Sequence, residues 1–258
     1  MNAEVEPTSR LPAQPPHPLL HSYYDDEAGR HRFLRRIFDE TAADYDRIER
    51  VLALGSGPWY RRMALQRAGL APGARMLDVG IGTGLVAREA LTILAGKGAV
   101  VGVDPSPGMM DQVDLPGVTL LQGRAEALPC ADASFDFVCM GYALRHVADV
   151  AAAFAEFRRV LRPGGRVLVL EISKPASRAA TLLLKAYMRA LVPLVSRAMG
   201  CRRDSARLWR YYWDTIEACI PPPRILAALE SAGLVQGQRR VELGIFSEYT
   251  ATRPQDEP

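Results

Sequence analysis

The 258-residue chain lacks the cysteine pattern of a metal site or of a disulfide framework. Its four cysteines are scattered along the sequence, form no Cys-x-x-Cys pair and have no histidine doublet nearby. Zinc sites and disulfide-rich secreted domains both need closely spaced cysteines. We therefore expect reduced thiols in a cytoplasmic protein, and no bound metal.

We also expect no secretion signal and no membrane span, and the net charge is small. The sequence does not open with a basic segment followed by an apolar stretch, which argues against a secretory signal. Its most apolar stretch, residues 179–195, is interrupted by Lys185, Arg189 and Pro193, whereas a membrane span needs about 18 uninterrupted apolar residues. A net charge of +3, without interleaved aromatic and basic residues, does not favour a nucleic acid partner.

Length and composition fit one globular domain with an extension. Prolines crowd the first 18 residues, so we expect a disordered tail over residues 1–29 and a folded domain over residues 30–258. Apolar residues recur at helical spacing over residues 30–54. After a Gly-Ser-Gly-Pro break, residues 59–68 favour a second short helix.

The rest of the chain alternates short apolar strands with helices. Strands are expected at residues 76–79, 99–103, 118–121, 135–140, 166–170, 235–241 and 245–251. Helices are expected at residues 85–95, 150–161 and 222–232. Continuously apolar strands that alternate with helices indicate a mostly parallel sheet buried on both faces. The sequence therefore predicts a doubly wound, Rossmann-like α/β fold with seven strands.

A helical and basic insert interrupts this alternation over residues 176–213. Together with the N-terminal helices, it is expected to cap the domain. The insert contains a single acidic residue, Asp204. Its basic residues are Arg178, Lys185, Arg189, Arg197, Arg202, Arg203, Arg207 and Arg210. A solvated helix packed on the domain would explain this pattern. The alternative is a lid that makes peripheral contact with a membrane and admits a hydrophobic substrate.

The most informative motif is Leu77-Asp-Val-Gly-Ile-Gly-Thr-Gly-Leu85, in which Gly80, Gly82 and Gly84 follow a strand and open a helix. Glycine allows a positive φ and a close backbone approach, and helix N-termini bind anionic groups. Asp104 ends the next strand 20 residues after Gly84. Doubly wound nucleotide-binding folds place a ribose-binding carboxylate there. The motif predicts a nucleoside cofactor, with Asp78 also part of its site.

The glycine spacing distinguishes between two such cofactors. Dinucleotide-binding loops read Gly-x-Gly-x-x-Gly, whereas this loop reads Gly-x-Gly-x-Gly, with Leu85 in the third position. In order, the segments 102–110, 123–129 and 135–138 resemble the motif series of class I methyltransferases. We therefore expect S-adenosyl-L-methionine, and not NAD, as the cofactor.

Residues 159–173 read Arg-Val-Leu-Arg-Pro-Gly-Gly-Arg-Val-Leu-Val-Leu-Glu-Ile-Ser, and residues 142–147 read Tyr-Ala-Leu-Arg-His-Val. These segments, with Tyr-Asp at residues 45–46 and Trp59, resemble the signatures of the ubiquinone/menaquinone biosynthesis C-methyltransferases. The resemblance implies that a cofactor pocket is lined by Thr83, Asp104, Arg124, Ala125 and Gly141. Departures from the family pattern are Arg124 for a common Asn or Asp, Gly141 for Ser, and His146 for Asn.

Methylation of a phenol or hydroquinone ring carbon requires loss of a ring hydroxyl proton. Arg145 and His146 follow the fourth strand, whose end faces the ligand crevice in such folds. Arg145 would stabilise a phenolate, and His146 would take the proton, giving a rate that rises through about pH 6–7. Tyr45 and Tyr142 are candidates for the acceptor wall. Each of these four residues also has a purely structural interpretation. Arg145 would brace the loop, His146 would stand at the start of a helix, and Tyr45 and Tyr142 would pack in the core.

The sequence thus favours an S-adenosylmethionine-dependent methyltransferase for a hydrophobic small molecule, most plausibly C-methylation of a quinone-pathway ring. One alternative is a natural-product or other small-molecule O-, N- or C-methyltransferase on the same scaffold. Another is a catalytically silent cofactor-binding scaffold of a quinone-synthesis complex. The sequence does not predict the oligomeric state.

Overall fold

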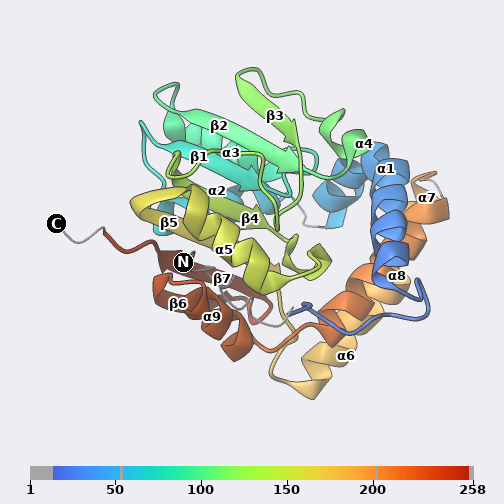
Figure 1. Ribbon diagram of the computed structural model, residues 1–258. Helices are drawn as coiled ribbons and strands as arrows, with labels where there is room; N and C mark the ends of the chain where they lie inside the picture. Colours follow the sequence, from blue (N-terminus) through green and yellow to red (C-terminus); the bar gives the residue numbers. More distant parts are fainter. Residues whose placement is uncertain (1–13, 53–54, 202, 256–258) are drawn as a thin grey trace, which may run out of the picture.

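The computed structural model describes residues 14–52, 55–201 and 203–255, and in this part of the chain a seven-stranded sheet forms the centre (Figure 1). The strand order is β3-β2-β1-β4-β5-β7-β6. Strands β1 to β5 are parallel, and β7 lies antiparallel between β5 and β6. The strands are β1 (Arg75–Val79), β2 (Ala99–Asp104), β3 (Val118–Gln122), β4 (Phe135–Gly141), β5 (Leu161–Ile172), β6 (Val235–Glu242) and β7 (Phe246–Thr252). The predicted mostly parallel seven-stranded fold is confirmed.

Helices cover both faces of this sheet. They are α1 (Glu27–Leu52), α2 (Gly57–Arg67), α3 (Leu85–Leu94), α4 (Pro107–Met110), η1 (Leu144–His146), α5 (Val150–Val160), α6 (Arg178–Ala186), η2 (Tyr187–Leu191), α7 (Val192–Ala198), α8 (Arg203–Ala218) and α9 (Pro222–Ser231). Side chains alternate between the faces, as strand geometry requires. Phe137 and Cys139 of β4 pack with α2 and α3, whereas Val138 and Met140 pack with α5 and α9.

A third apolar cluster lies outside the sheet and consists largely of aromatic side chains. It joins α1, α7 and α8 to the segment before α1, with Phe33, Tyr211 and Trp213 all buried. In Figure 1 these helices stand together beside the sheet. Helices α1, α7 and α8 therefore form one layer of their own, held together by apolar and aromatic packing.

The prediction of a disordered tail over residues 1–29 needs correction. Residues 1–13 lie outside the described residues, but residues 14–29 pack on the domain. The Gln14 carbonyl accepts the Val150 amide at 2.9 Å, and the Pro16 carbonyl accepts the Ile220 amide at 2.7 Å. His17 is buried. Prolines hold such a segment extended, so its carbonyls remain free to accept these bonds from the domain.

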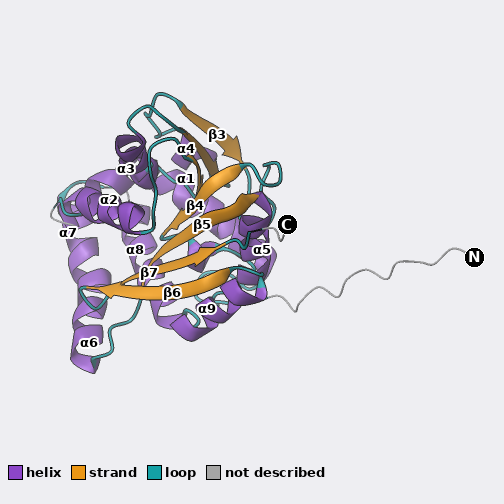
Figure 2. Ribbon diagram, turned by 90° about the vertical axis from the view of Figure 1, so that its left-hand side faces the viewer, coloured by secondary structure: helices purple, strands orange, loops and turns teal. Residues whose placement is uncertain are grey.

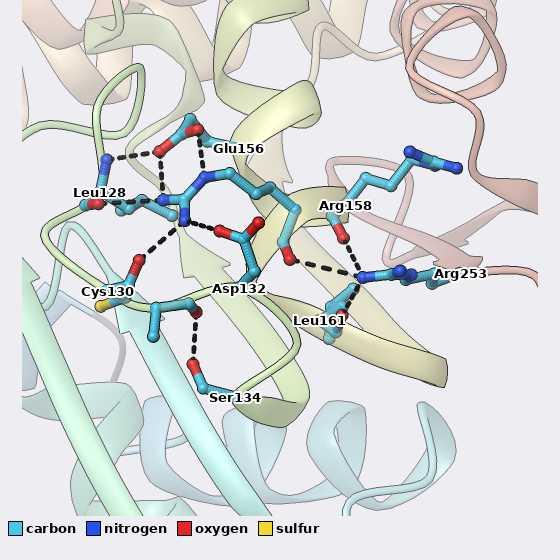
Figure 3. A network of polar contacts seen from close by, with 10 residues as sticks. Leu128, Cys130, Asp132, Ser134, Glu156, Arg158, Leu161 and Arg253 are labelled. Atoms are coloured by element: carbon cyan, nitrogen blue, oxygen red, sulfur yellow. Dashed lines mark hydrogen bonds and ion pairs between the residues drawn. The ribbon is translucent and has the colours of Figure 1, made fainter.

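An arginine at the end of α5 holds the loop between β3 and β4. Arg159 pairs with Glu156 and Asp132 and donates to the carbonyls of Leu128 and Cys130 (Figure 3). Arg253 donates to three carbonyls at the end of the same helix, which are those of Arg158, Arg159 and Leu161. The Arg-Val-Leu-Arg-Pro-Gly-Gly segment thus stabilises the fold at a distance from the ligand side.

Helices α6, η2 and α7 follow one another without a break along one side of the molecule (Figure 2). Among the described residues, this continuous Arg178–Ala198 helix is long and apolar enough to cross a membrane, judged by length and composition alone. It contains the Lys185, Arg189 and Pro193 that interrupt the apolar stretch in the sequence, and a single helix of this kind is weak evidence for a membrane span. Part of the helix is buried, with Met188, Val192 and Ser196 packed inward. Arg202 lies outside the described residues.

Candidate functional site

A cavity opens at the carboxyl ends of β1, β2 and β4, between the sheet and helices α1, α2 and α8. Parallel strands leave their loops at one edge, so side chains far apart in the sequence converge there. The predicted residues that line the cavity are Tyr45, Gly80, Gly82, Thr83, Asp104, Arg124, Ala125, Gly141, Tyr142 and His146. Asp78, Gly84 and Arg145 are not among the lining residues.

Asp104 lies at the end of β2 with both carboxylate oxygens anchored by backbone amides. One oxygen accepts the Gly82 amide at 2.9 Å, and the other accepts the Ser106 amide at 2.8 Å. Burial raises the pKa of Asp104 to about 6, against the effect of these two bonds. Each oxygen retains a further lone pair, so the carboxylate can accept the two hydroxyls of a ribose.

The glycine loop provides a close backbone surface for a ligand. Gly80 has a φ of 71°, and a Cβ there would come within 2.7 Å of the Ala143 Cβ, so a larger residue would displace the loop. Gly82 also has a positive φ, of 56°, but no atom lies within 4 Å of its Cβ position. A side chain at Gly82 would therefore project into open space in the cavity. Gly84 caps α3 instead of lining the cavity.

Helix α1 reaches over this loop and fixes it. The Thr83 hydroxyl donates to Asp46 of α1, and Asp39 of α1 accepts the Ser106 hydroxyl at 2.6 Å. Arg124 is half exposed, and its Nε donates to Glu126 at 3.4 Å. Ala125 and Gly141 complete the walls beside the ends of β3 and β4. The N-terminal helix is therefore part of the site.

Asp78 stands behind the glycine loop and not in the cavity. Its carboxyl group is fully buried, and neither oxygen has a hydrogen-bond partner among the described residues. Burial, with a smaller effect of the Asp104 carboxylate, raises the pKa of Asp78 to about 7. The expectation that Asp78 contacts the cofactor directly is not supported by this geometry.

Arg145 is not placed to stabilise a phenolate. Its guanidinium turns away from the cavity, pairs with Glu171 at the end of β5 and donates to the Thr215 hydroxyl of α8 at 3.2 Å. Both charged side chains are almost fully buried. This arrangement favours the alternative of a brace over the predicted catalytic role, and the brace also orients the next residue.

His146 does line the cavity, inside a cage of aromatic rings. Its imidazole stacks on Tyr212 at 5.5 Å between ring centroids and on Tyr211 at 5.7 Å, and it meets the edge of Phe38 at 5.2 Å. Burial, and then the nearby Arg145 charge, lower the pKa of His146 well below its usual value. Neither ring nitrogen has a partner among the described residues. The ring is therefore a neutral base with free hydrogen-bonding capacity.

Tyr45 and Tyr142 both line the cavity, in agreement with their predicted position. Tyr45 accepts the Tyr212 hydroxyl at 3.3 Å and stacks on Trp209. Tyr142 has a φ of 62°, which is rare for a residue other than glycine. Such strain persists where the surrounding structure imposes it, as it does at many functional sites.

Sequence reasoning missed several wall residues contributed by helices. Leu34 and Phe38 of α1 line the apolar part of the cavity, and Arg61 of α2 lines the part beside Tyr142. Phe38 belongs to the apolar repeat of α1, and this repeat does not distinguish residues that pack in the core from residues that line a cavity. Arg61 follows Trp59 by two residues, so its place in the N-terminal signature was the one available signal.

The sheet order, the glycine loop and the anchored Asp104 together define a class I S-adenosylmethionine-dependent methyltransferase. Residues 26–252 match the model of the ubiE/COQ5 methyltransferase family. The chain is 36% identical over 223 residues to a demethylmenaquinone methyltransferase of Mycobacterium sp. (strain KMS), covering 84% of this chain and 93% of that one. It is 31% identical over 207 residues to a ubiquinone/menaquinone biosynthesis C-methyltransferase of Hahella chejuensis, covering 77% and 82%. The chain therefore belongs to the ubiE/COQ5 methyltransferase family.

Solved structures agree with this fold. A methyltransferase of Thermotoga maritima described as a possible histamine N-methyltransferase superposes with a TM-score of 0.61, at 22% identity, over 85% of this chain and 99% of that one. A phosphoethanolamine N-methyltransferase of Haemonchus contortus in complex with S-adenosyl-L-methionine superposes with a TM-score of 0.55, at 18% identity, over 76% and 53%. At these identities the likeness concerns the fold alone.

We expect replacement of Asp104 by alanine to weaken S-adenosylmethionine binding roughly 10- to 150-fold, because charged hydrogen bonds worth about 1.5–3 kcal/mol are lost. Since the pKa of Asp104 is raised to about 6, wild-type affinity should fall as the pH drops below that value. Calorimetric titration from pH 5 to 8 measures both effects. Unchanged affinity in a folded variant would contradict the assignment, as would tight binding of NAD by the wild type.

We expect Arg145→Met to lower the free energy of unfolding by about 3–5 kcal/mol, because Glu171 would be left buried without its partner. The double variant Arg145→Met/Glu171→Leu should recover most of this loss. Urea unfolding of the three proteins measures the difference. Full stability of the single variant together with a large loss of turnover would instead restore a catalytic role for Arg145.

Proposed function

We propose that this enzyme transfers a methyl group from S-adenosylmethionine to a ring carbon of a quinone-type acceptor in its reduced, hydroquinone form. One observation carries the proposal: the cavity joins a polar cofactor part to an aromatic part that contains a neutral, unpartnered histidine. The similarity to a demethylmenaquinone methyltransferase and to a ubiquinone/menaquinone biosynthesis C-methyltransferase supports the same acceptor class.

The aromatic part of the cavity suits a flat, apolar ring. Leu34 and Phe38 come from α1, Tyr212 from α8, and His146 and Val147 from the segment after β4. Aromatic rings pack on each other in offset or edge-to-face arrangements, which add to the apolar area that is buried. A hydroquinone between these side chains would lie beside Gly141 and the end of β4, next to the cofactor part.

His146 is the residue that fits proton removal. S-adenosylmethionine supplies an electrophilic methyl group and leaves as S-adenosylhomocysteine. The imidazole takes the proton of a ring hydroxyl, which raises the electron density at the adjacent ring carbon. That carbon forms the new bond to the methyl group while the bond from sulfur to methyl breaks. Its hydrogen then departs to solvent as a proton and the ring becomes aromatic again as a phenolate. The phenolate oxygen takes back the proton held by His146, which restores the neutral imidazole.

The environment of His146 changes the pH dependence that the sequence predicted. An unperturbed histidine gives a rate that rises through about pH 6–7. Because burial lowers the pKa of His146 well below 6.5, the imidazole is already neutral throughout this range. The rate should therefore be flat from pH 6 to 7 as far as His146 is concerned, and it should fall only at lower pH.

The acceptor and the base can be tested together with reduced demethylmenaquinone and S-adenosylmethionine, by mass spectrometry of the ring-methylated product. We expect turnover in the wild type and a loss of about 100- to 10,000-fold in His146→Phe, which keeps a ring but removes the base. Cofactor affinity should remain unchanged. Cofactor binding without turnover of any quinone acceptor in the wild type would contradict the proposal and favour a scaffold role.

We further propose that the Arg178–Ala198 helix lies on an anionic membrane surface and that the acceptor enters from there. Its outward side carries Leu182, Leu183 and Leu194, each about two-thirds or more exposed. Arg178 and Arg197 are exposed near its two ends, where they could meet lipid phosphates. An amphipathic helix with apolar residues on one side and basic residues beside them binds in the plane of the membrane interface.

We expect sedimentation with vesicles that contain anionic lipid, weaker with neutral vesicles and in high salt. The variant Leu183→Glu/Leu194→Glu should reduce binding by about tenfold or more, because two exposed apolar contacts are lost. Leu243→Glu is the matched control, since Leu243 is 86% exposed on the β6–β7 turn and is not part of this helix. Equal binding by all three proteins would contradict this placement.

A further inference from the structure

Arg61 of α2 is a buried cation whose hydrogen bonds are incomplete. Its side chain is 5% exposed, and its Nη2 donates to Glu49 Oε1 of α1 at 2.6 Å. The Nε and Nη1 groups are buried and have no partner among the described residues. Leaving buried donors unpaired costs about 1–3 kcal/mol each, so native proteins rarely do so unless something else fills the place.

The backbone next to this cation leaves space for it. A Cβ on Gly57 would lie 2.5 Å from Glu49 Oε1 and 2.7 Å from Arg61 Nη1, so no larger residue fits there without displacing the pair. Gly57, the first residue of α2, therefore leaves room for the ion pair. Glu49 in turn holds the guanidinium in one orientation at the cavity wall.

The sheet order places Arg61 on the opposite side of the glycine loop from Asp104. In the order β3-β2-β1-β4, the loop after β1 lies between the ends of β2 and β4. Asp104 ends β2, whereas the Arg61 Cζ lies 5.9 Å from the centre of the Tyr142 ring, directly after β4. A ligand whose ribose meets Asp104 and whose chain crosses the glycine loop would end at Arg61.

The chemistry of the cofactor matches this position. S-adenosylmethionine carries a ribose on one side of its sulfur and an α-carboxylate on the other. The other arginines that line the cavity among the described residues are Arg35 and Arg124, whose side chains are 65% and 45% exposed and pair with Asp39 and Glu126. A buried guanidinium with unpaired N–H groups binds a carboxylate far better than such exposed arginines do.

We propose that Arg61, oriented by Glu49, binds the α-carboxylate of the methionine part of S-adenosylmethionine. Arg61 then completes its hydrogen bonds only in the complex, and α1 and α2 are drawn together by the same ligand. The proposal rests on the cofactor and not on the identity of the acceptor, so binding measured without an acceptor tests it independently of the quinone assignment.

Two ligands separate a contact with the carboxylate from a general effect on the pocket. S-adenosylhomocysteine carries the α-carboxylate, whereas 5′-methylthioadenosine has the same adenosine and thioether without it. We expect Arg61→Met to weaken S-adenosylhomocysteine binding roughly 10- to 150-fold in calorimetry and to leave methylthioadenosine binding unchanged. Arg61→Lys, which keeps the charge, should retain part of the affinity. It gives a second test if Arg61→Met does not fold.

Arg62→Ala is the matched control on the same helix. Arg62 pairs with Glu89 of α3 at 2.8 Å and does not line the cavity, so both affinities should remain as in the wild type. Equal weakening of both ligands by Arg61→Met would show that the residue only holds α1 against α2. Unchanged binding of S-adenosylhomocysteine in a folded variant would also overturn the proposal.

Discussion

The buried ion pair between Arg145 and Glu171 connects the parts of the molecule that form the acceptor site. The guanidinium joins the end of β5 to Thr215 of α8, while the Arg145 carbonyl accepts His17 at 3.1 Å and Arg30 at 3.4 Å. One residue thus ties the sheet to the N-terminal segment, to α1 and to α8. A buried pair contributes little net stability, because desolvation offsets the attraction between the charges. What it provides here is a fixed position for the next residue, His146.

Two kinds of packing meet at the cavity. Strand ends and tight glycine turns form the cofactor part, where the backbone itself presents the binding groups. Helices α1 and α8 form the proposed acceptor part, where aromatic side chains supply the surface. Substitutions in the helical layer can therefore change which acceptor binds while the glycine loop and Asp104 stay in place. This separation is consistent with a fold that serves many methyl acceptors.

The sequence predicted best what depends on local patterns. The alternation of strands and helices, the glycine loop and the position of Asp104 each follow from residues close together in the chain. The side-chain direction of Arg145 depends on Glu171 and Thr215, which are 26 and 70 residues away. Arg61 is likewise defined by Glu49 and Tyr142. No spacing rule indicates such pairings, so sequence reasoning predicted that Arg145 would stabilise a phenolate and missed Arg61.

The cage around His146 bears on how a buried residue would act as the base in the proposed reaction. The rings of Tyr211, Tyr212 and Phe38 shield the imidazole from water. The nearby positive charge of Arg145 disfavours a positive charge on the imidazole. Both effects keep the free base neutral, which lets it accept a proton at neutral pH. They also make the protonated form costly. A phenolate formed beside the ring would offset that cost, because it supplies the negative partner that the cage lacks. In the proposed reaction, the proton transfer would therefore be favoured only when an acceptor occupies the cavity, which would make the action of the base depend on its substrate.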